Sequence, residues 1–194
     1  MSSDLKEKNM KNVLVVSGHP DVKNSFANKI ILEEFTKISP DAKIDELGKL
    51  YPDFKIDVKA EQERLIKADI IVLQFPFFWY SVPSLMQKWF EDVLVHGFSH
   101  GSTGDKLKGK ILIASFTSGA PEDMYQKGAL QNHTVDEFLA PLEQLASLTG
   151  MKWGGYVYSG GLSYASRNDE SKLAQMRAKA KEHAKRLSEF IKNL

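Results

Sequence analysis

Short apolar runs alternate with longer amphipathic segments along the chain. The short runs are rich in β-branched residues, and some alternate between apolar and polar positions, as strands do. They predict strands at residues 13–16, 43–47, 69–75, 111–116 and 153–159. The longer segments repeat an apolar residue every three or four positions, which predicts helices. These helices run from residue 24 or 25 to a break at 39–41, over 58–68, over 84–94, from 134 to 149, and from 168 or 169 to the C-terminus.

Local signals define several helix ends and inward faces. Pro83 is expected at the first position of its helix, and Thr134 and Glu137 have the spacing of a capping box. Pro141 lies inside the helix that follows and is expected to kink or divide it. In the polar helix at 58–68, Leu65 and Ile66 are expected to face inward.

Strands that alternate with helices in this way predict one α/β domain with a parallel sheet and helices on both faces. The common doubly wound order for five strands is 2-1-3-4-5. The length of 194 residues fits a single medium domain with a sizeable core. We therefore expect the domain at residues 12–194, after a polar tail over residues 1–11 that lacks the apolar core of a secretory signal.

Composition excludes several classes of function. The chain contains no cysteine, which rules out disulfides, thiolate nucleophiles and cysteine-ligated metal sites. A formal net charge of +1 predicts neither a nucleic-acid-binding protein nor an acidic carrier. No apolar run approaches the ~20 residues of a membrane-spanning helix. These features together predict a cytoplasmic protein.

The chemistry is expected where the loops after the first, third and fourth strands meet, because ligands of open α/β sheets bind at the carboxyl ends of the strands. The first of these loops runs into the start of a helix, whose free N–H groups suit a phosphate. Ser25 can donate its hydroxyl there and His19 a ring N–H. The competing interpretation is an ordinary helix start at which Ser25 caps only its own backbone.

The loop after the third strand is aromatic, since five of the six residues at 75–80 are Phe, Trp or Tyr. Packing in the core is the alternative to ligand binding, and Phe75 is expected in the core. The number of rings favours a platform for a flat ligand. Backbone N–H groups after Pro76 are expected to be free of the sheet and able to bond the edge of a heterocycle.

The loop after the fourth strand offers small and hydroxyl-bearing residues at Thr117, Ser118, Gly119 and Ala120. Such residues allow the backbone to approach a flat ligand closely. Beyond them lie Tyr125 and His133, which can donate or relay a proton, although each alone is also compatible with an ordinary surface position. A phosphate site beside a stacked heterocycle describes a flavin nucleotide. The glycine fingerprint expected of a protein that binds NAD alone is absent.

The motifs resemble those of the NAD(P)H:quinone oxidoreductases of the flavodoxin-like fold, and in particular a short bacterial branch that includes the ancillary flavoproteins of glutathione-gated potassium efflux. The resemblance is carried by Gly18-His19-Pro20, residues 24–28, residues 74–83, residues 117–120 and Tyr125. It implies a homodimer that binds FMN or FAD and reduces quinones, or similar flat electrophiles, by hydride transfer from NAD(P)H. It also raises the possibility of peripheral association with a membrane transporter.

The resemblance also implies roles for individual residues. The flavin phosphate region would be held by His19, Ser25, Phe26, Ala27 and Asn28, and the isoalloxazine would be lined by Pro76, Phe77, Phe78 and Trp79. Its other edge would be bonded by Thr117, Ser118, Gly119 and Ala120, with Tyr125 as the active-site tyrosine. Ser118 and Ala120 replace a threonine and a glycine of the family pattern, and both changes are small. The spacing from Tyr125 to His133 is longer than in the animal enzymes, so His133 is a less direct match to the family histidine.

The expected mechanism is ping-pong, with NAD(P)H and the quinone using the same place in turn. The sequence leaves two alternatives open. One is an electron-transfer flavodoxin, although such carriers are usually strongly acidic and this chain is not. The other is a redox-sensing regulatory subunit of a potassium-efflux transporter, for which the basic final helix could supply a docking face.

Overall fold

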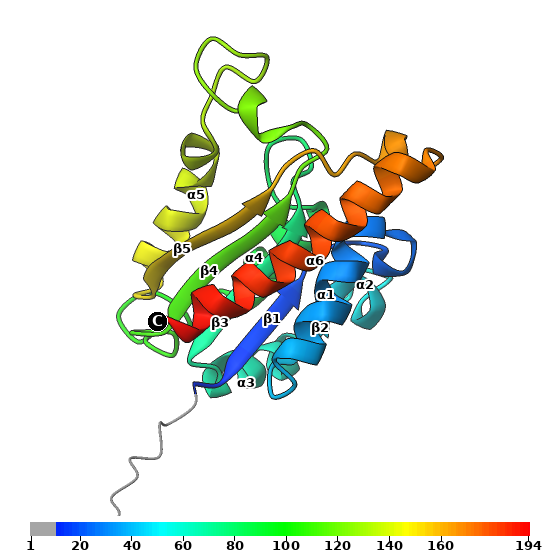
Figure 1. Ribbon diagram of the computed structural model, residues 1–194. Coiled ribbons are helices and arrows are strands. Elements are labelled where there is room, and N and C mark those ends of the chain that lie inside the picture. The colour runs from blue at the N-terminus through cyan, green and yellow to red at the C-terminus, as the bar shows by residue number, and fades with distance from the viewer. Residues whose placement is uncertain (1–10) are drawn as a thin grey trace, which may run out of the picture.

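The computed structural model describes residues 11–194, so the predicted polar tail lies outside the described residues except at its last position. Its centre is a five-stranded parallel sheet in the order β2-β1-β3-β4-β5 (Figure 1). The strands are β1 (Val13–Ser17), β2 (Lys43–Glu46), β3 (Ile70–Pro76), β4 (Ile111–Thr117) and β5 (Lys152–Ser159). The predicted fold class and strand order are therefore confirmed.

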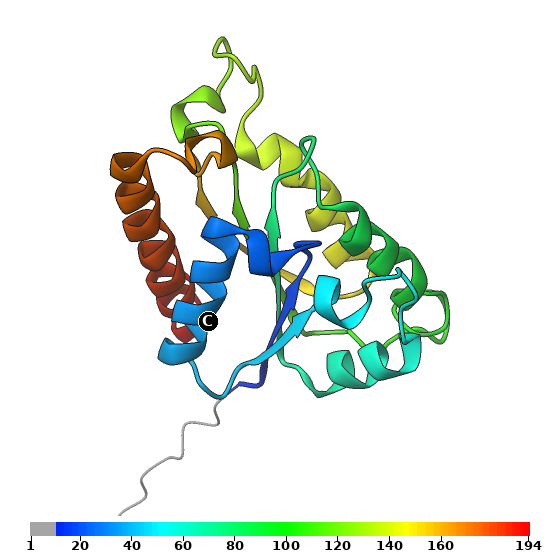
Figure 2. The ribbon, with the colours of Figure 1, turned by 90° about the vertical axis from the view of Figure 1, so that its right-hand side faces the viewer.

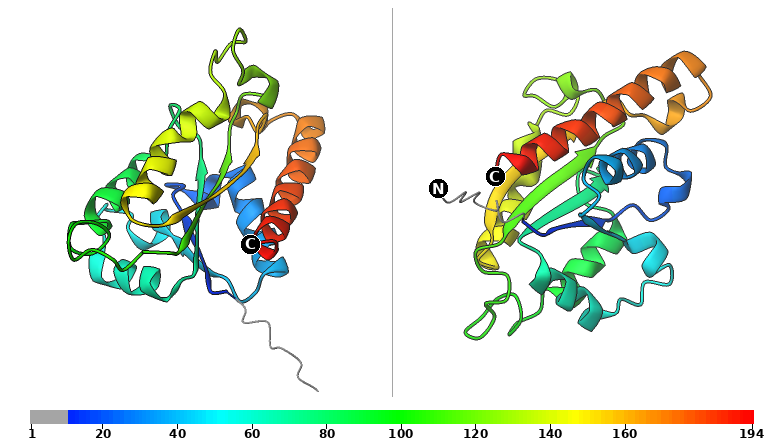
Figure 3. Two further views of the ribbon diagram at one scale, coloured as in Figure 1. Left: turned by 90° about the vertical axis from the view of Figure 1, so that its left-hand side faces the viewer. Right: turned by 60° about the horizontal axis from the view of Figure 1, so that its bottom comes forward.

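Helices cover both faces of this sheet. They are α1 (Phe26–Ile38), α2 (Leu47–Leu50), α3 (Val58–Lys67), α4 (Ser84–Val93), α5 (Val135–Leu148) and α6 (Glu170–Lys192), with 3-10 turns η1 (Val22–Asn24), η2 (Glu122–Met124) and η3 (Tyr164–Ser166). Figure 2 shows α1 and α6 together on one face and α3, α4 and α5 on the other. The opposite view in Figure 3 shows the edge strand β5 between α5 and α6.

Alternation along the strands divides the core between the two faces. Val15, Val72 and Ile113 pack toward α1 and α6, whereas their immediate neighbours in sequence pack toward α3, α4 and α5. Because side chains two residues apart share a face, the α1 and α6 side also receives a row of polar residues. This row is Ser17, Gln74, Ser115 and Ser159, and all four are fully buried.

Four local predictions need correction. Leu47 begins α2 and does not end the second strand. Pro83 is the N-cap of α4, one position before the expected one. The helix that contains Pro141 is a single element, so this proline does not divide it, and the ring of Pro141 lies on the exposed side of the helix. Ile66 is 49% exposed, since one residue turns a helix by about 100° away from the buried Leu65.

The capping box at Thr134 and Glu137 is present, and the apolar stripe of α4 is buried as its spacing predicts. In the part of the chain that the structure describes, no helix is both long enough and apolar enough to cross a membrane.

A cluster of charged groups lies beneath α3. The carboxylate of Glu61 is fully buried and accepts hydrogen bonds from Tyr51 Oη (2.6 Å), from Trp89 Nε1 (2.9 Å) and from Arg64. Asp45 is also buried, but its Oδ2 has no partner among residues 11–194, and its Oδ1 lies 3.6 Å from Arg64 Nε. Burial raises the pKa of Asp45 to about 6, and the nearby charge of Glu61 adds to the rise, although Arg64 opposes it.

We therefore predict that Asp45→Asn stabilises the fold in a pH-dependent manner. The folded pKa of Asp45 lies above its unfolded value, so its contribution to stability is fully present at low pH and is lost as the pH rises through about 6. The variant should gain ~1–2 kcal/mol in free energy of unfolding at pH 8 and roughly nothing near pH 4. Urea denaturation at the two pH values measures this difference. The exposed control Asp41→Asn should change neither value, and a variant less stable than wild type at pH 8 would contradict the assignment.

Candidate functional site

A cleft of about 1210 Å³ opens at the carboxyl end of the sheet. The segments that follow β1, β3 and β4 line it, because the carboxyl ends of parallel strands meet at one edge. Among the residues predicted from the sequence, the cleft brings together His19, Ser25, Phe26, Ala27, Asn28, Pro76, Phe77, Phe78, Thr117, Ser118 and Gly119. Trp79, Ala120, Tyr125 and His133 lie outside this lining, and their proposed roles stay predictions.

The head of α1 presents hydrogen-bond donors to the cleft. Ser25 is the N-cap, and its Oγ accepts from the backbone N–H of Asn28 at 3.2 Å. The N–H groups of Phe26 and Ala27 belong to the first turn, where no carbonyl of the helix can accept them. His19 Nδ1 accepts from the N–H of Asp21 at 3.0 Å, so the neutral ring carries its proton on Nε2. Burial lowers the pKa of His19, against the opposing charge of Asp21, which favours this neutral form.

Two hydroxyl groups beside the helix head are also available as donors. The side-chain amide of Asn28 donates from Nδ2 to Ser25 Oγ (3.4 Å) and to Thr117 Oγ1 (3.3 Å). Each hydroxyl therefore receives a hydrogen bond and keeps its own hydrogen for another acceptor. Asn28 is only 3% exposed, and its Oδ1 accepts from Gln74 Nε2 at 2.9 Å. The geometry suits an anionic oxygen between the two hydroxyls and the first turn of α1.

The aromatic segment forms a tight turn beside the cleft. The backbone groups of Phe78 and Ser81 exchange two hydrogen bonds of 3.0 Å, with Trp79 and Tyr80 between them. Both central residues are left-handed, with φ of 49° and 64°, a conformation that hairpin turns usually assign to Asn and Gly. Two bulky residues in this conformation store strain, which is common next to functional sites.

The expectation of free N–H groups after Pro76 is only partly correct. The N–H of Phe77 donates to the carbonyl of Thr117 at 2.7 Å, and that of Phe78 is used within the turn. The N–H groups of Trp79 and Tyr80 have no partner among the described residues. The predicted core position of Phe75 is confirmed, since this ring is 1% exposed and stacks on Phe116 at 5.4 Å.

Tyr125 lies behind the cleft in an aromatic cluster. Its ring is 9% exposed and contacts those of Phe77 and Phe138. Burial raises the pKa of Tyr125, so the phenol is protonated at neutral pH and can donate a hydrogen bond. The ring of His133 packs against that of Phe138, which also contacts Tyr125. Nδ1 of His133 lies 3.4 Å from a carboxylate oxygen of Glu137, and both side chains are largely exposed.

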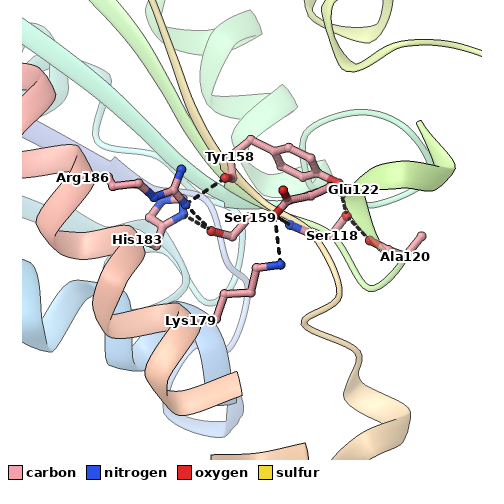
Figure 4. Close-up of polar contacts among 9 residues, drawn as sticks. Ser118, Ala120, Glu122, Tyr158, Ser159, Lys179, His183 and Arg186 are labelled. Atoms are coloured by element: carbon pink, nitrogen blue, oxygen red, sulfur yellow. Dashed lines mark hydrogen bonds and ion pairs between the residues drawn. The ribbon is translucent and has the colours of Figure 1, made fainter. Parts of the chain in front are cut away.

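A second polar cluster supports the loop after β4 (Figure 4). Ser118 Oγ donates to the carbonyl of Ala120 at 2.8 Å, so it accepts from the hydroxyl of Tyr158 at 2.6 Å. Glu122 accepts from the N–H of Gly160 and from Lys179, each at 3.0 Å. These contacts attach the loop to β5 and α6 and hold Ser118 and Gly119 at the cleft.

One wall of the cleft was missed by the sequence interpretation. The segment between β5 and α6 and the start of α6 contribute Leu162, Ser163, Tyr164, Arg167, Leu173, Met176 and Arg177. Arg167 lies 4.1 Å from the ring centre of Tyr164, and Arg177 lies 5.3 Å from that of Phe26. The predicted strand order could have identified this wall, because the loop after the fifth strand begins at the same edge of the sheet. Its two arginines bring positive charge to the phosphate side.

These groups fit a flavin nucleotide. Backbone, hydroxyl and imidazole donors surround the place for a phosphate, and Pro76, Phe77 and Phe78 form an apolar wall for a flat ring. Gly119 also lines the cleft, without a side chain. The donors at the head of α1 are the observation that decides the fit, because their residues line the cleft and the N–H groups of Phe26 and Ala27 have no acceptor within residues 11–194.

Comparisons with known proteins agree with this assignment. The family model described as "Flavodoxin-like fold" matches residues 11–184. The chain is 35% identical to the uncharacterised NAD(P)H oxidoreductase YrkL of Bacillus subtilis, over 92% of this chain and 97% of that protein. It is 32% identical to KefG, the glutathione-regulated potassium-efflux system ancillary protein of Escherichia coli, over 93% of this chain and 92% of that protein. The structure of general stress protein 14 from Treponema denticola in complex with FMN has a TM-score of 0.81, with 26% identity, and the match covers 92% of this chain and 99% of that one.

The strained turn leads to a prediction about stability. Trp79 is 93% exposed and left-handed, so Trp79→Asn loses little buried surface and relieves backbone strain. The variant should gain ~1 kcal/mol in free energy of unfolding, as measured by denaturant titration. Leu130→Asn is the matched control, because Leu130 is 79% exposed but is not left-handed. Equal stability changes in the two variants would show that exposure alone, and not the turn conformation, accounts for the effect.

Proposed function

Because the chain belongs to the NAD(P)H:quinone oxidoreductase family of the flavodoxin-like fold, we propose that it is a flavin-dependent enzyme that transfers a hydride from NAD(P)H to quinones. The observation that carries the proposal is the pairing of anion donors at the head of α1 with a flat apolar wall in the same cleft. When bound, the flavin supplies the hydride chemistry, and the protein supplies position and electrostatics. FMN is the proposed cofactor, since the related protein from Treponema denticola was solved with it.

Each wall of the cleft has a separate task in this proposal. Ser25, Thr117 and the first turn of α1 bind the phosphate region. Pro76, Phe77 and Phe78 exclude water from one side of the ring system. The N–H groups of Trp79 and Tyr80, in the turn that follows Phe78, have no partner within residues 11–194 and can bond its polar edge. Tyr125 is protonated at neutral pH, so it can donate to an oxygen that gains negative charge or pass a proton to the departing product.

The two substrates would use the same place in turn. The apolar wall covers one side of the flavin ring and leaves the other side for a substrate, so the nicotinamide would leave before the quinone enters, which is ping-pong kinetics. Recognition by flat apolar surface selects by shape more than by functional group, so other flat electrophiles would also be reduced. His133 is proposed to assist proton delivery at the edge of the aromatic cluster, next to Phe138.

We also propose that the enzyme acts as a homodimer. The neighbouring aromatic residues Phe78, Trp79 and Tyr80 are 44%, 93% and 49% exposed. An apolar groove of about 240 Å³ lies beside them, between the turn and α5. Exposed apolar patches of this kind usually mark an interaction site. A second copy over this face would cover the open side of the cleft, and light scattering with size-exclusion chromatography measures the mass.

Purified protein tests the proposed function directly. It should be yellow, release FMN on heating and oxidise NAD(P)H when menadione is added, with parallel lines in double-reciprocal plots. Ser25→Ala should weaken FMN affinity about tenfold and leave riboflavin affinity nearly unchanged, because it removes one hydrogen bond to a charged phosphate. A colourless protein that cannot be reconstituted with flavin would contradict the proposal.

The identity of 32% with a potassium-efflux ancillary protein over almost the whole chain supports a second candidate function. In it, the chain is a peripheral regulatory subunit of a membrane transporter, and its oxidoreductase activity is secondary. An affinity-tagged chain expressed in its native host would then copurify with a membrane transporter in detergent extracts. Recovery of the chain without a transporter, together with full menadione reductase activity, favours the enzyme.

A further inference from the structure

A continuous series of hydrogen bonds begins on α6 beneath the carboxyl end of the sheet. Arg186 Nη2 donates to Ser159 Oγ at 2.7 Å and to the carbonyl of Tyr158 at 3.0 Å. Ser159 Oγ lies 2.9 Å from His183 Nδ1, and the other ring nitrogen, Nε2, lies 2.8 Å from Ser115 Oγ. Figure 4 shows Arg186, His183 and Ser159 pointing toward one another where α6 crosses β5.

The series continues across the sheet to the head of α1. Ser115 Oγ donates to Gln74 Oε1 at 2.5 Å, and Gln74 Nε2 donates to Asn28 Oδ1 at 2.9 Å. Asn28 then donates to the two hydroxyls at the cleft, those of Ser25 and Thr117. We call this series of residues, from Arg186 to Asn28, the polar chain.

The interior members of the polar chain have no access to solvent. Ser115, Ser159, Gln74 and His183 are each 0% exposed, and Asn28 is 3% exposed. A buried polar hydrogen without an acceptor is costly. The hydroxyl and amide groups of the polar chain therefore have to hydrogen-bond to other groups in the protein interior. Burial, with a smaller effect of the Arg186 charge, lowers the pKa of His183 to about 3, so the ring is neutral and protonated on one nitrogen only.

The arginine at the start decides in which direction the hydrogens point. A guanidinium can only donate, so Ser159 accepts from Arg186 and passes its own hydrogen to His183 Nδ1. His183 then donates from Nε2 to Ser115, which donates to Gln74. In the reverse direction, Ser159 would receive hydrogens from both neighbours and its own hydroxyl hydrogen would have no acceptor.

The direction of the hydrogen bonds matters most at the Asn28 end of the polar chain. With the hydrogens running from Arg186, Asn28 turns its NH₂ group toward Ser25 and Thr117, whose own hydrogens stay free for the cleft. With both amides reversed, Asn28 Oδ1 would accept these two hydrogens and the cleft would lose two donors. A terminal amide can take either orientation with little change in shape, so the groups behind it determine which one is stable.

We propose that Arg186 and His183 are positioning residues that set the direction of the polar chain, so that Ser25 and Thr117 both offer their hydroxyl hydrogens to an anionic group in the cleft. This proposal rests on the proposed function, in which that group is the phosphate of the flavin. Neither Arg186 nor His183 lines the cleft, so neither side chain contacts the anionic group directly, and the polar chain links them to it.

The first experiment uses the flavin-free protein. Nitrogen-15 NMR of the five imidazoles, with His183 assigned from the spectrum of His183→Gln, reports which ring nitrogen carries the proton. We expect His183 to be neutral with a proton on Nε2 and none on Nδ1 throughout pH 6 to 8. A proton on Nδ1, or a mixture of the two forms, would overturn the proposed direction.

The second experiment measures the affinity for FMN and for riboflavin, which lacks the phosphate. Ser115→Ala, which interrupts the chain, and Arg186→Met, which removes its first donor, should each lower the ratio of FMN to riboflavin affinity about tenfold, the size of one lost hydrogen bond to a charged group. Ser17→Ala is the control for a lost buried hydroxyl, because Ser17 pairs with Gln74 in the sheet but its Oγ has no hydrogen bond within residues 11–194. Lys185→Met is the control for a lost charge on α6.

An unchanged affinity ratio in Ser115→Ala and Arg186→Met overturns the proposal, as does an equal fall in both controls. Failure of the proposed function is a separate result. A wild-type protein that binds neither FMN nor riboflavin would contradict the proposed function. The NMR measurement on the flavin-free protein would still decide the direction of the hydrogen bonds in the polar chain.

Discussion

The structure depends on the requirement that polar atoms buried on a parallel sheet must be hydrogen-bonded. The α1 and α6 face of the sheet is apolar until the strands approach their carboxyl ends, where Gln74, Ser115 and Ser159 interrupt it. Each of these residues is 0% exposed and could not be solvated. A single histidine on α6 and a single asparagine on α1 join them into one series of bonds. The helices on this face are therefore positioned by polar contacts as well as by packing.

Each face of the sheet leaves one buried side-chain atom without a partner among residues 11–194, Ser17 Oγ on the α1 and α6 face and Asp45 Oδ2 on the other. Glu61 has three donors around its carboxylate and is fully buried, whereas Asp45 keeps an oxygen without a partner among residues 11–194. The difference appears in the pKa of Asp45, which burial raises to about 6. This incomplete satisfaction costs stability only when Asp45 is ionised, so the cost is absent at low pH and grows as the pH rises through about 6. At the head of α1, an amide facing the wrong way would instead change which hydrogens the cleft presents.

The aromatic turn shows how much the site depends on backbone conformation. Trp79 and Tyr80 have left-handed backbones although neither is Gly or Asn, and their N–H groups have no partner within residues 11–194. A relaxed turn sequence could form the same hairpin at lower cost. Retention of two large rings in this conformation fits a surface that contacts a flat ligand, a second copy of the chain, or both. The proposed chemistry thus combines a rigid, polar phosphate side with a strained, apolar ring side.

Hydrophobic periodicity in the sequence was enough to determine the alternation of strands and helices, and with it the sheet order and the edge where the loops meet. Local chemistry also identified Ser25, the aromatic segment and Thr117 as neighbours, because parallel strands place their carboxyl ends together. Periodicity could not predict that Ile66 is exposed. Leu65 and Ile66 are adjacent apolar residues, and which of them faces the core depends on how α3 packs against the rest of the fold. The sequence also did not reveal the role of His183. This residue lies on α6, and its two hydrogen-bond partners, Ser115 and Ser159, come from different strands. Only the tertiary structure decides such contacts, since the direction of a buried hydrogen bond depends on every other donor and acceptor within reach.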